Sequence, residues 1–372
     1  MKHLTTTFYF LLFITTAFSQ MPEMPDRVDE MAAEYFGNGK PIVGGVIGII
    51  DGVNRYAKGY GRVSLDDTAV PDIDTVYEIA SLSKTFTGVL LGDMVVRHEL
   101  SLDDTLDRFV PQGVLVPRYE GKTVTLRQLT THSSGLPRLP TDFWEVAAPE
   151  PDNPYKFYLS DKIERFLDTY QLTVAPGSRY EYSNLGASVL GYVIEKKTGQ
   201  PYEPLVQERI CKPLGMTNTA VVLTETMRKK LAPPYDAKQQ PASNWDLPGF
   251  AAGGGLRSSM RDMLAFAQAA AGVFEVFPDF AEKPDHPLVL GMKAASVPHY
   301  EETTSHRRVG LGWHINESDD LTHNGQTGGY HSYIIVSPKS RRAIVLLTNT
   351  AVDDADRLGK ELWNSFEAIF SP

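Results

Sequence analysis

Apolar positions follow strand spacing at the two ends of the chain and mostly helical spacing in its middle. Near the start, a helical face over residues 25–36 precedes a β-rich run at 42–50, and a returning run at 55–63 follows an Asp51-Gly52 turn. Near the end, the pattern predicts further strands and a closing helix. These strands are 312–315, 320–323, 330–336 and 343–349, and the helix is 354–370.

The middle of the chain, from about residue 100 to 310, reads as helices separated by loops. The predicted helices are a short one opening at 102–104 and longer ones at 125–132, 161–170, 185–197 and 259–271. Residues 145–157 and 273–306 are predicted to be irregular loops.

This distribution predicts an α/β protein in which one antiparallel sheet is built from both chain ends and flanked by helices. We expect residues 20–98 and 307–372 to form the sheet domain and residues 99–306 an inserted, mainly helical domain. A functional site is expected in the cleft between the two.

Residues 76–80 lead into a helix that begins at Ser81 and ends near His98. Ser81 and Lys84 are three residues apart, so both side chains lie on one face of that helix. Free N–H groups in the first turn favour a developing anion at Ser81, and burial would lower the pKa of Lys84 from ~10.4 toward a neutral amine base. The structural alternative is a serine N-cap followed by an exposed lysine.

Composition excludes some partners and suggests export. The chain is 42% hydrophobic and carries a net charge of −10, which argues against nucleic acid or an anionic membrane as a partner. Residues 1–19 resemble a signal peptide, with a basic start, an apolar run and small residues before Gln20, so we expect a secreted, periplasmic protein without a stable membrane anchor. Cys211 is the only cysteine, which excludes an intramolecular disulfide.

Two further stretches could serve a nucleophilic serine. Tyr182-Ser183-Asn184 lies on a turn before a helix, where Tyr182 could accept a proton if a nearby ammonium lowered its pKa, and Asn184 could hold Lys84 or a substrate. The alternative is a turn tyrosine with Asn184 as helix N-cap. The stretch 323–329, His-Asn-Gly-Gln-Thr-Gly-Gly, ends one predicted strand and could offer the N–H of Gln326 to an oxyanion, or could be a glycine-rich hairpin. A literal Lys-Thr-Gly at 197–199 is interpreted as a helix C-terminus capped by its glycine.

Together, in this order, Ser-x-Ser-Lys, Tyr-Ser-Asn and His-Asn-Gly resemble the motifs of the serine β-lactamase and penicillin-binding-protein superfamily. The middle element is similar to that of its class C β-lactamase branch. Residues 129–137, 176–177, 213–216 and 251–256 resemble the same family, so the likeness extends from about residue 25 to 370.

The resemblance implies a role for each motif residue. Ser81 would be the acylated nucleophile, Lys84 and Tyr182 would share proton transfer, and the N–H groups of Ser81 and Gln326 would form the oxyanion hole. Substrate would be bound by the remaining motif residues, Asn184, His323, Asn324 and Gly325, together with Gln326. No metal and no organic cofactor are implied.

Two positions depart from the class C pattern. His323 replaces the usual lysine of the third motif and carries a full charge only below its pKa, near ~6.5 when unperturbed. If it clamped a substrate carboxylate as an imidazolium, KM for such substrates would rise between pH 5.5 and 7.5. Arg138 and Leu139 follow Pro137 where class C enzymes usually carry a glutamine, and both departures weaken the expectation of efficient cephalosporin hydrolysis.

The sequence thus predicts a hydrolase that acts on a small-molecule or peptide substrate through an acyl-enzyme. Hydrolysis of β-lactams is the first expected activity, and hydrolysis of D-amino-acid peptides or small esters is the alternative. A binding or sensor module that is acylated without turnover is the non-enzymatic alternative. The chain has neither the Gly-x-Ser-x-Gly of an α/β-hydrolase esterase nor a regular zinc-ligand spacing.

Overall fold

A large antiparallel sheet organises the molecule, whose computed structural model describes residues 24–370, with side chains described for 25–366. Strands from the two ends of the chain meet within this sheet, where β1 pairs with β12 as the second and third strands from one edge. In spatial order the strands are β2 (Asn54–Gly61), β1 (Gly44–Asp51), β12 (Arg342–Thr348), β11 (His331–Ser337), β10 (Leu321–Gln326), β9 (His314–Ile315), β8 (Arg308–Val309) and β7 (Tyr300–Glu301).

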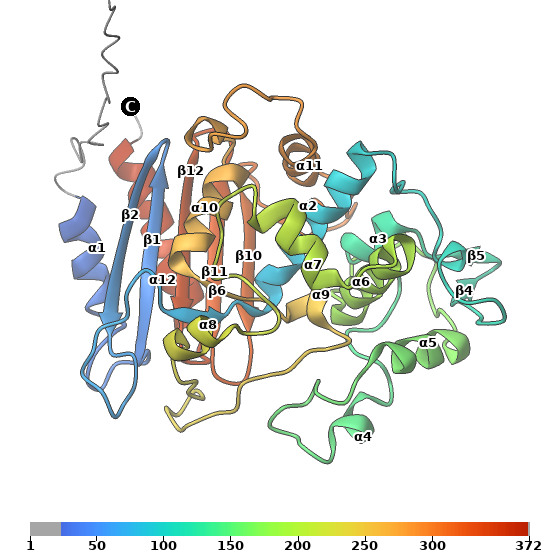
Figure 1. The fold of residues 1–372 in the computed structure, drawn as a ribbon, viewed down its shortest axis with the longest axis horizontal. Coiled ribbons are helices and arrows are strands. Elements are labelled where there is room, and N and C mark those ends of the chain that lie inside the picture. The colour runs from blue at the N-terminus through green and yellow to red at the C-terminus, as the bar shows by residue number, and fades with distance from the viewer. Residues whose placement is uncertain (1–23, 371–372) are drawn as a thin grey trace, which may run out of the picture.

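Helices cover both faces of this sheet (Figure 1). On the outer face, α1 (Met24–Ala32) and α12 (Asp354–Phe370) pack against alternate strand residues such as Ile47 and Ile335. On the inner face, α10 (Met260–Ala270) packs against β1 and β12. The alternation of side chains along each strand supplies both apolar faces.

The helical region lies beside the inner face and surrounds α2 (Ser83–Val96), which is buried over almost its whole length. One hydrophobic core runs from the inner face of the sheet into this region. The other helices of the helical region are α3 (Leu126–Thr130), α4 (Phe143–Ala147), α5 (Ser160–Thr169), α6 (Asn184–Thr198), α7 (Tyr202–Val206), α8 (Glu225–Lys230), α9 (Ala251–Gly254) and α11 (Pro287–Ala295). The domain boundaries near residues 98 and 306 stay a prediction.

A small sheet connects the start of α2 to the middle of the chain. Its strands β3 (Val76–Glu78) and β6 (Arg257–Ser259) are antiparallel, with Glu78 opposite Arg257. A second small sheet, β4 (Arg118–Tyr119) with β5 (Lys122–Thr123), lies in the helical region.

Two predicted boundaries are wrong. Residues 273–306 are not a continuous loop, because α11 forms there and packs on α2 through apolar residues such as Leu288 and Met292. The turn predicted from 323 onward begins later, because β10 continues to Gln326. No helix in residues 24–370 is long and apolar enough to cross a membrane, and the predicted signal peptide lies outside the described residues.

Candidate active site

Ser81 lies in a single 3₁₀ turn, Ala80–Leu82, that runs directly into α2. The preceding residue, Ala80, has φ of 47°, in the left-handed region that a residue with a Cβ seldom adopts. Strand β10 packs directly on this turn, since a Cβ at Gly325 would lie 2.8 Å from the backbone nitrogen of Ser81. Ser81 is therefore held at a strained turn between the buried helix and the sheet.

Lys84 lies one helical turn after Ser81 and is 2% exposed. Its Nζ is 3.0 Å from Ser81 Oγ, 2.9 Å from Asn184 Oδ1 and 2.5 Å from the carbonyl oxygen of Gly253. The amide and carbonyl oxygens can only accept hydrogen bonds. A neutral amine would donate one N–H to each of them and direct its lone pair at the hydroxyl of Ser81.

The charge states favour this neutral amine. Burial lowers the pKa of Lys84 well below 10.5, and the positive charge of Arg138 lowers it further. Burial raises the pKa of Tyr182 above 10, although a hydrogen bond with Ser81 opposes the rise. The hypothesis of a tyrosinate base therefore receives no support, and Lys84 is the better proton acceptor.

Tyr182 and Asn184 are positioned by the start of α6. The hydroxyl of Ser183 accepts from the N–H of Gly186 at 2.8 Å and is the N-cap, so Asn184 is not the cap that the alternative interpretation required. The side chain of Asn184 is thus free to accept from Lys84, while its Nδ2 donates to the hydroxyl of Tyr155 at 3.3 Å. The ring of Tyr182 lies over Lys84, whose Nζ is 4.9 Å from the ring centre.

The third motif residues lie on alternate faces of β10. Asn324 and Gln326 point toward the outer face: Asn324 Nδ2 donates to Asp356 Oδ2 at 2.6 Å, and Gln326 Nε2 donates to the carbonyl of Ala351 at 3.2 Å. Both side chains are therefore bonded away from Ser81, although Gln326 lines the same pocket as Ser81. Asn324 was predicted to bind substrate, but its side chain is committed to α12.

His323 points inward and is 3% exposed. Its Nδ1 lies 2.6 Å from the carbonyl oxygen of Asn324, so Nδ1 carries a proton and donates it, while the buried Nε2 has no hydrogen-bond partner among the described residues. Burial, with His314 and Lys84 nearby, lowers the pKa of His323 well below 6.5. The imidazolium clamp considered from the sequence is therefore not supported, because His323 is neutral near neutral pH.

Sequence reasoning missed an aromatic wall around Tyr182. The ring of His132 lies 4.4 Å from that of Tyr182, and the ring of His314 stacks on His323 at 5.1 Å. Tyr180 closes the wall, with its hydroxyl 2.8 Å from His314 Nε2. His132 belongs to the stretch 129–137 that carries the family resemblance, but nothing in the sequence placed it beside Tyr182.

A pocket opens beside Ser81. Its lining was also missed, apart from Ser81, Asn184 and Gln326. The other lining residues are Ala80, Tyr155, Trp245, Leu247, Phe250, Gly253, Gly254 and Thr327.

Within residues 24–370, no group of three or more histidine, cysteine or acidic side chains is arranged to hold a metal ion. The arrangement can therefore activate a hydroxyl, hold an acyl group next to it and offer backbone N–H groups to an oxyanion.

Comparison with known proteins identifies the family of this chain. A family model described as Beta-lactamase matches residues 28–364. The D-alanyl-D-alanine-carboxypeptidase/endopeptidase AmpH of Escherichia coli (strain K12) is 27% identical over 338 residues, which cover 88% of this chain and 85% of that protein. Protein flp of Staphylococcus aureus (strain N315) is 26% identical over 313 residues, 82% of this chain and 59% of that protein.

Solved structures share the fold. A beta-lactamase/D-alanine carboxypeptidase from Yersinia pestis, complexed with citrate, has a TM-score of 0.76 at 23% identity and covers 92% of this chain and 99% of its own. Its counterpart from Pseudomonas syringae has a TM-score of 0.76 at 19% identity, with 94% and 99% covered. The predicted antiparallel sheet with flanking helices is confirmed.

Proposed function

Because the chain belongs to the beta-lactamase family, we propose that it is a serine hydrolase that cleaves β-lactam amides through an acyl-enzyme on Ser81. The observation that carries the proposal is the contact between Lys84 Nζ and Ser81 Oγ at 3.0 Å, made by an amine whose pKa is lowered by burial. Such an amine can accept the serine proton near neutral pH.

The proposed acylation moves one proton and exchanges one bond. The proton of the Ser81 hydroxyl passes to Lys84 Nζ while Oγ attacks the carbonyl carbon, and the oxyanion is stabilised by the N–H groups of Ser81 and Gln326. The C–N bond then breaks, and the leaving nitrogen receives the proton from Lys84, with the protonated hydroxyl of Tyr182 as the relay. In deacylation, water gives a proton to Lys84 Nζ and attacks the ester carbonyl. The bond from the carbonyl carbon to Ser81 Oγ then breaks, and Lys84 returns the proton to Oγ.

A D-alanyl peptide is the second candidate substrate. It is favoured by the name of AmpH, a D-alanyl-D-alanine-carboxypeptidase/endopeptidase that matches 88% of this chain. The same proton transfers would cleave this amide. Export to the periplasm with removal of residues 1–19 is also part of the proposal, supported by the sequence pattern.

The deciding experiment compares kcat/KM on nitrocefin, a D-Ala-D-Ala peptide and p-nitrophenyl butyrate, and locates the label of a fluorescent penicillin by mass spectrometry. We expect Ser81→Ala to abolish labelling and turnover, and Ser318→Ala, at an exposed serine outside the site, to retain both. A dominant nitrocefin rate supports a β-lactamase, and a dominant peptide rate supports the peptidase. Labelling of Ser81→Ala at another residue would refute the nucleophile, and acylation without turnover of any substrate would indicate a sensor module.

A further inference from the structure

Trp245 forms one wall of the pocket beside Ser81. That pocket has a volume of about 270 Å³ including its open mouth, and both Trp245 and Ser81 line it. The indole contacts Tyr155, with ring centres 5.4 Å apart, and its Nε1 would be 2.8 Å from a Cβ placed on Gly328. Because Gly253 and Gly254 contribute no side chains, bulky residues such as Trp245, Tyr155 and Phe250 determine how much room an acyl group finds.

The segment that carries Trp245 belongs to no helix or strand. Residues 242–247 have no regular secondary structure, so ladder hydrogen bonds do not fix this wall. Its position depends instead on side chains from elsewhere in the fold.

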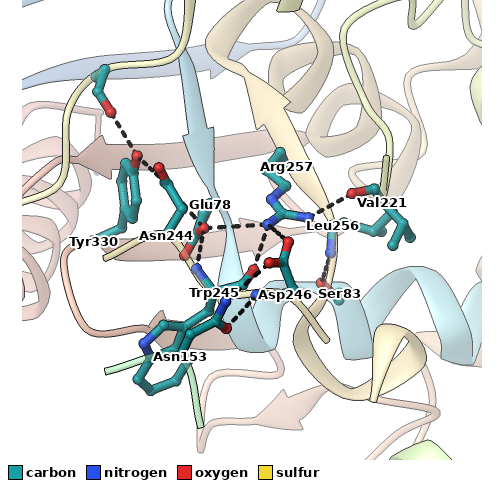
Figure 2. Close-up of polar contacts among 11 residues, drawn as sticks. Glu78, Ser83, Asn153, Val221, Asn244, Trp245, Asp246, Leu256, Arg257 and Tyr330 are labelled. Carbon is teal, nitrogen blue, oxygen red and sulfur yellow. Dashed lines mark hydrogen bonds and ion pairs between the residues drawn. The ribbon is translucent and has the colours of Figure 1, made fainter. Parts of the chain in front are cut away.

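Glu78 and Arg257 supply those side chains, from opposite positions in β3 and β6 (Figure 2). Glu78 Oε1 accepts the N–H of Trp245 at 2.8 Å and the Nδ2 of Asn244 at 3.3 Å. Arg257 Nη2 donates to the carbonyl of Trp245, and its Nη1 donates to the carbonyl of Val221 at 2.5 Å. Both polar groups of the Trp245 backbone are therefore held by this pair.

The pair is buried and close to the nucleophile. The side chains of Glu78 and Arg257 are 2% and 6% exposed and 3.5 Å apart, and Glu78 precedes Ser81 by three residues. A buried ion pair is a weak source of stability, because the cost of desolvation offsets most of its attraction. Its definite consequence here is geometric, since it fixes the Trp245 backbone relative to the turn of Ser81.

Asp246 connects the loop that carries Asn153 and Tyr155 to Arg257 and to the segment that carries Trp245. Its N–H donates to Asn153 Oδ1 at 2.8 Å, and its Oδ2 accepts from Asn153 Nδ2 at 2.9 Å. Asp246 Oδ1 lies 3.6 Å from Arg257 Nη2. The loop that carries Tyr155, two residues after Asn153, is thus tied to the segment that carries Trp245.

We propose that Trp245 is a specificity-determining residue that limits the acyl group bound beside Ser81 to a short apolar group, and that Glu78 and Arg257 are the positioning residues that hold it there. The proposal rests on the proposed acylation of Ser81. According to this proposal, the enzyme prefers substrates with a small acyl side chain, such as a methyl group, to substrates with a long alkyl chain.

The test is the rate of covalent labelling by two fluorophosphonates, one with a methyl and one with an octyl group on phosphorus. We expect Trp245→Ala to raise the octyl-to-methyl rate ratio by about 10-fold or more, since each methylene in an apolar pocket changes discrimination by roughly 10-fold or more. Trp245→Phe should raise it less, because an aromatic wall remains. Arg257→Lys should also raise it, because an ammonium cannot reproduce the fork that reaches two carbonyls.

Trp144→Ala is the matched control, because Trp144 is 66% exposed and does not line the pocket. The final extent of labelling gives the active fraction, and the ratio of two rates does not depend on that fraction, so partial unfolding does not imitate the result. An unchanged or lowered ratio in Trp245→Ala would overturn the role of Trp245. An unchanged ratio in Arg257→Lys would overturn the positioning role. No labelling of the wild-type protein by either reagent would refute the acylation of Ser81 instead.

Discussion

At the scale of single residues, the chemistry depends on how Lys84 is kept neutral. Burial is the main cause of its lowered pKa, and the charge of Arg138 is the second. Arg138 is exposed, with its guanidinium carbon 5.1 Å from the centre of the Tyr182 ring. The proton acceptor is therefore tuned partly by a surface side chain that can be changed without opening the core.

Removing that charge should raise the pKa of Lys84. We expect kcat/KM of the wild-type enzyme to fall in acid as Lys84 becomes protonated, and Arg138→Gln to move this acidic limb to higher pH. Arg307→Gln is the matched control, because Arg307 is also exposed and stacks on Tyr180 at 4.3 Å but is not a cause of the Lys84 shift. The measurement is a pH profile of kcat/KM, and coincident acidic limbs in Arg138→Gln and wild type would contradict the coupling.

His323 leads to a second prediction at this scale. Burial lowers the pKa of His323 well below 6.5, so we expect the imidazole to stay mainly neutral as the pH rises from 5.5 to 7.5. We therefore expect KM for a carboxylated substrate, divided by KM for its methyl ester, to stay constant over this range. A ratio that rises steadily with pH would restore the imidazolium clamp and would show that His323 is better solvated than the structure indicates.

At the scale of elements, β10 and the turn of Ser81 form a single unit. A Cβ on Gly325 would lie 2.5 Å from the carbonyl oxygen of Ile79 and 2.8 Å from the nitrogen of Ser81, so the strand approaches the turn more closely than any side chain permits. On the other face, Asp356 of α12 accepts from Asn324 and lies 2.7 Å from His331 Nε2. The strand is thus fixed from both sides.

Gly325→Ala should separate the strand from the turn. Because this displaces the Gln326 N–H from the position proposed for the oxyanion hole, we expect kcat to fall by about 10²–10³-fold, the usual cost of losing one such donor. Thr322→Ala, on the same strand, should change kcat far less. Thermal denaturation would confirm that both variants fold, and a folded Gly325→Ala with wild-type kcat would show that β10 does not supply the donor.

The sequence predicted helices and strands well where the apolar pattern was long and periodic. It did not predict contacts between residues that are far apart in the sequence. The strands at both chain ends and helices such as α6 follow their apolar spacing, and Ser81, Lys84, Tyr182 and Asn184 do lie together. Helix α11 was missed because proline and histidine around it indicated a loop. The pair of Glu78 with Arg257 joins residues 179 positions apart, and no local pattern reveals such a contact.

At the scale of the whole molecule, one continuous core determines the properties of the site. The apolar residues of the inner sheet face, α2 and the helical region form a single cluster, and Lys84, His132 and His323 are buried in the same part of the molecule. Burial is the first cause of the lowered pKa of each of these groups, and nearby positive charges, such as that of Arg138 for Lys84 and His132, lower these pKa values further. Loosening the packing between sheet and helical region would therefore change catalysis and stability together.

The half-buried His314 predicts a loss of stability in acid. Burial lowers the pKa of His314 to about 4, whereas an unfolded histidine titrates near 6.5, so the unfolded chain binds more protons between these values. The contribution of His314 to the free energy of unfolding is fully present above pH ~6.5 and decreases as the pH falls toward 4, by up to about 3 kcal/mol.

We expect His314→Gln to reduce the difference between the unfolding free energies in urea at pH 7 and pH 4.5. His306→Gln is the control, because that imidazole is 82% exposed. Equal pH dependence in His314→Gln and wild type would mean that His314 does not carry this linkage.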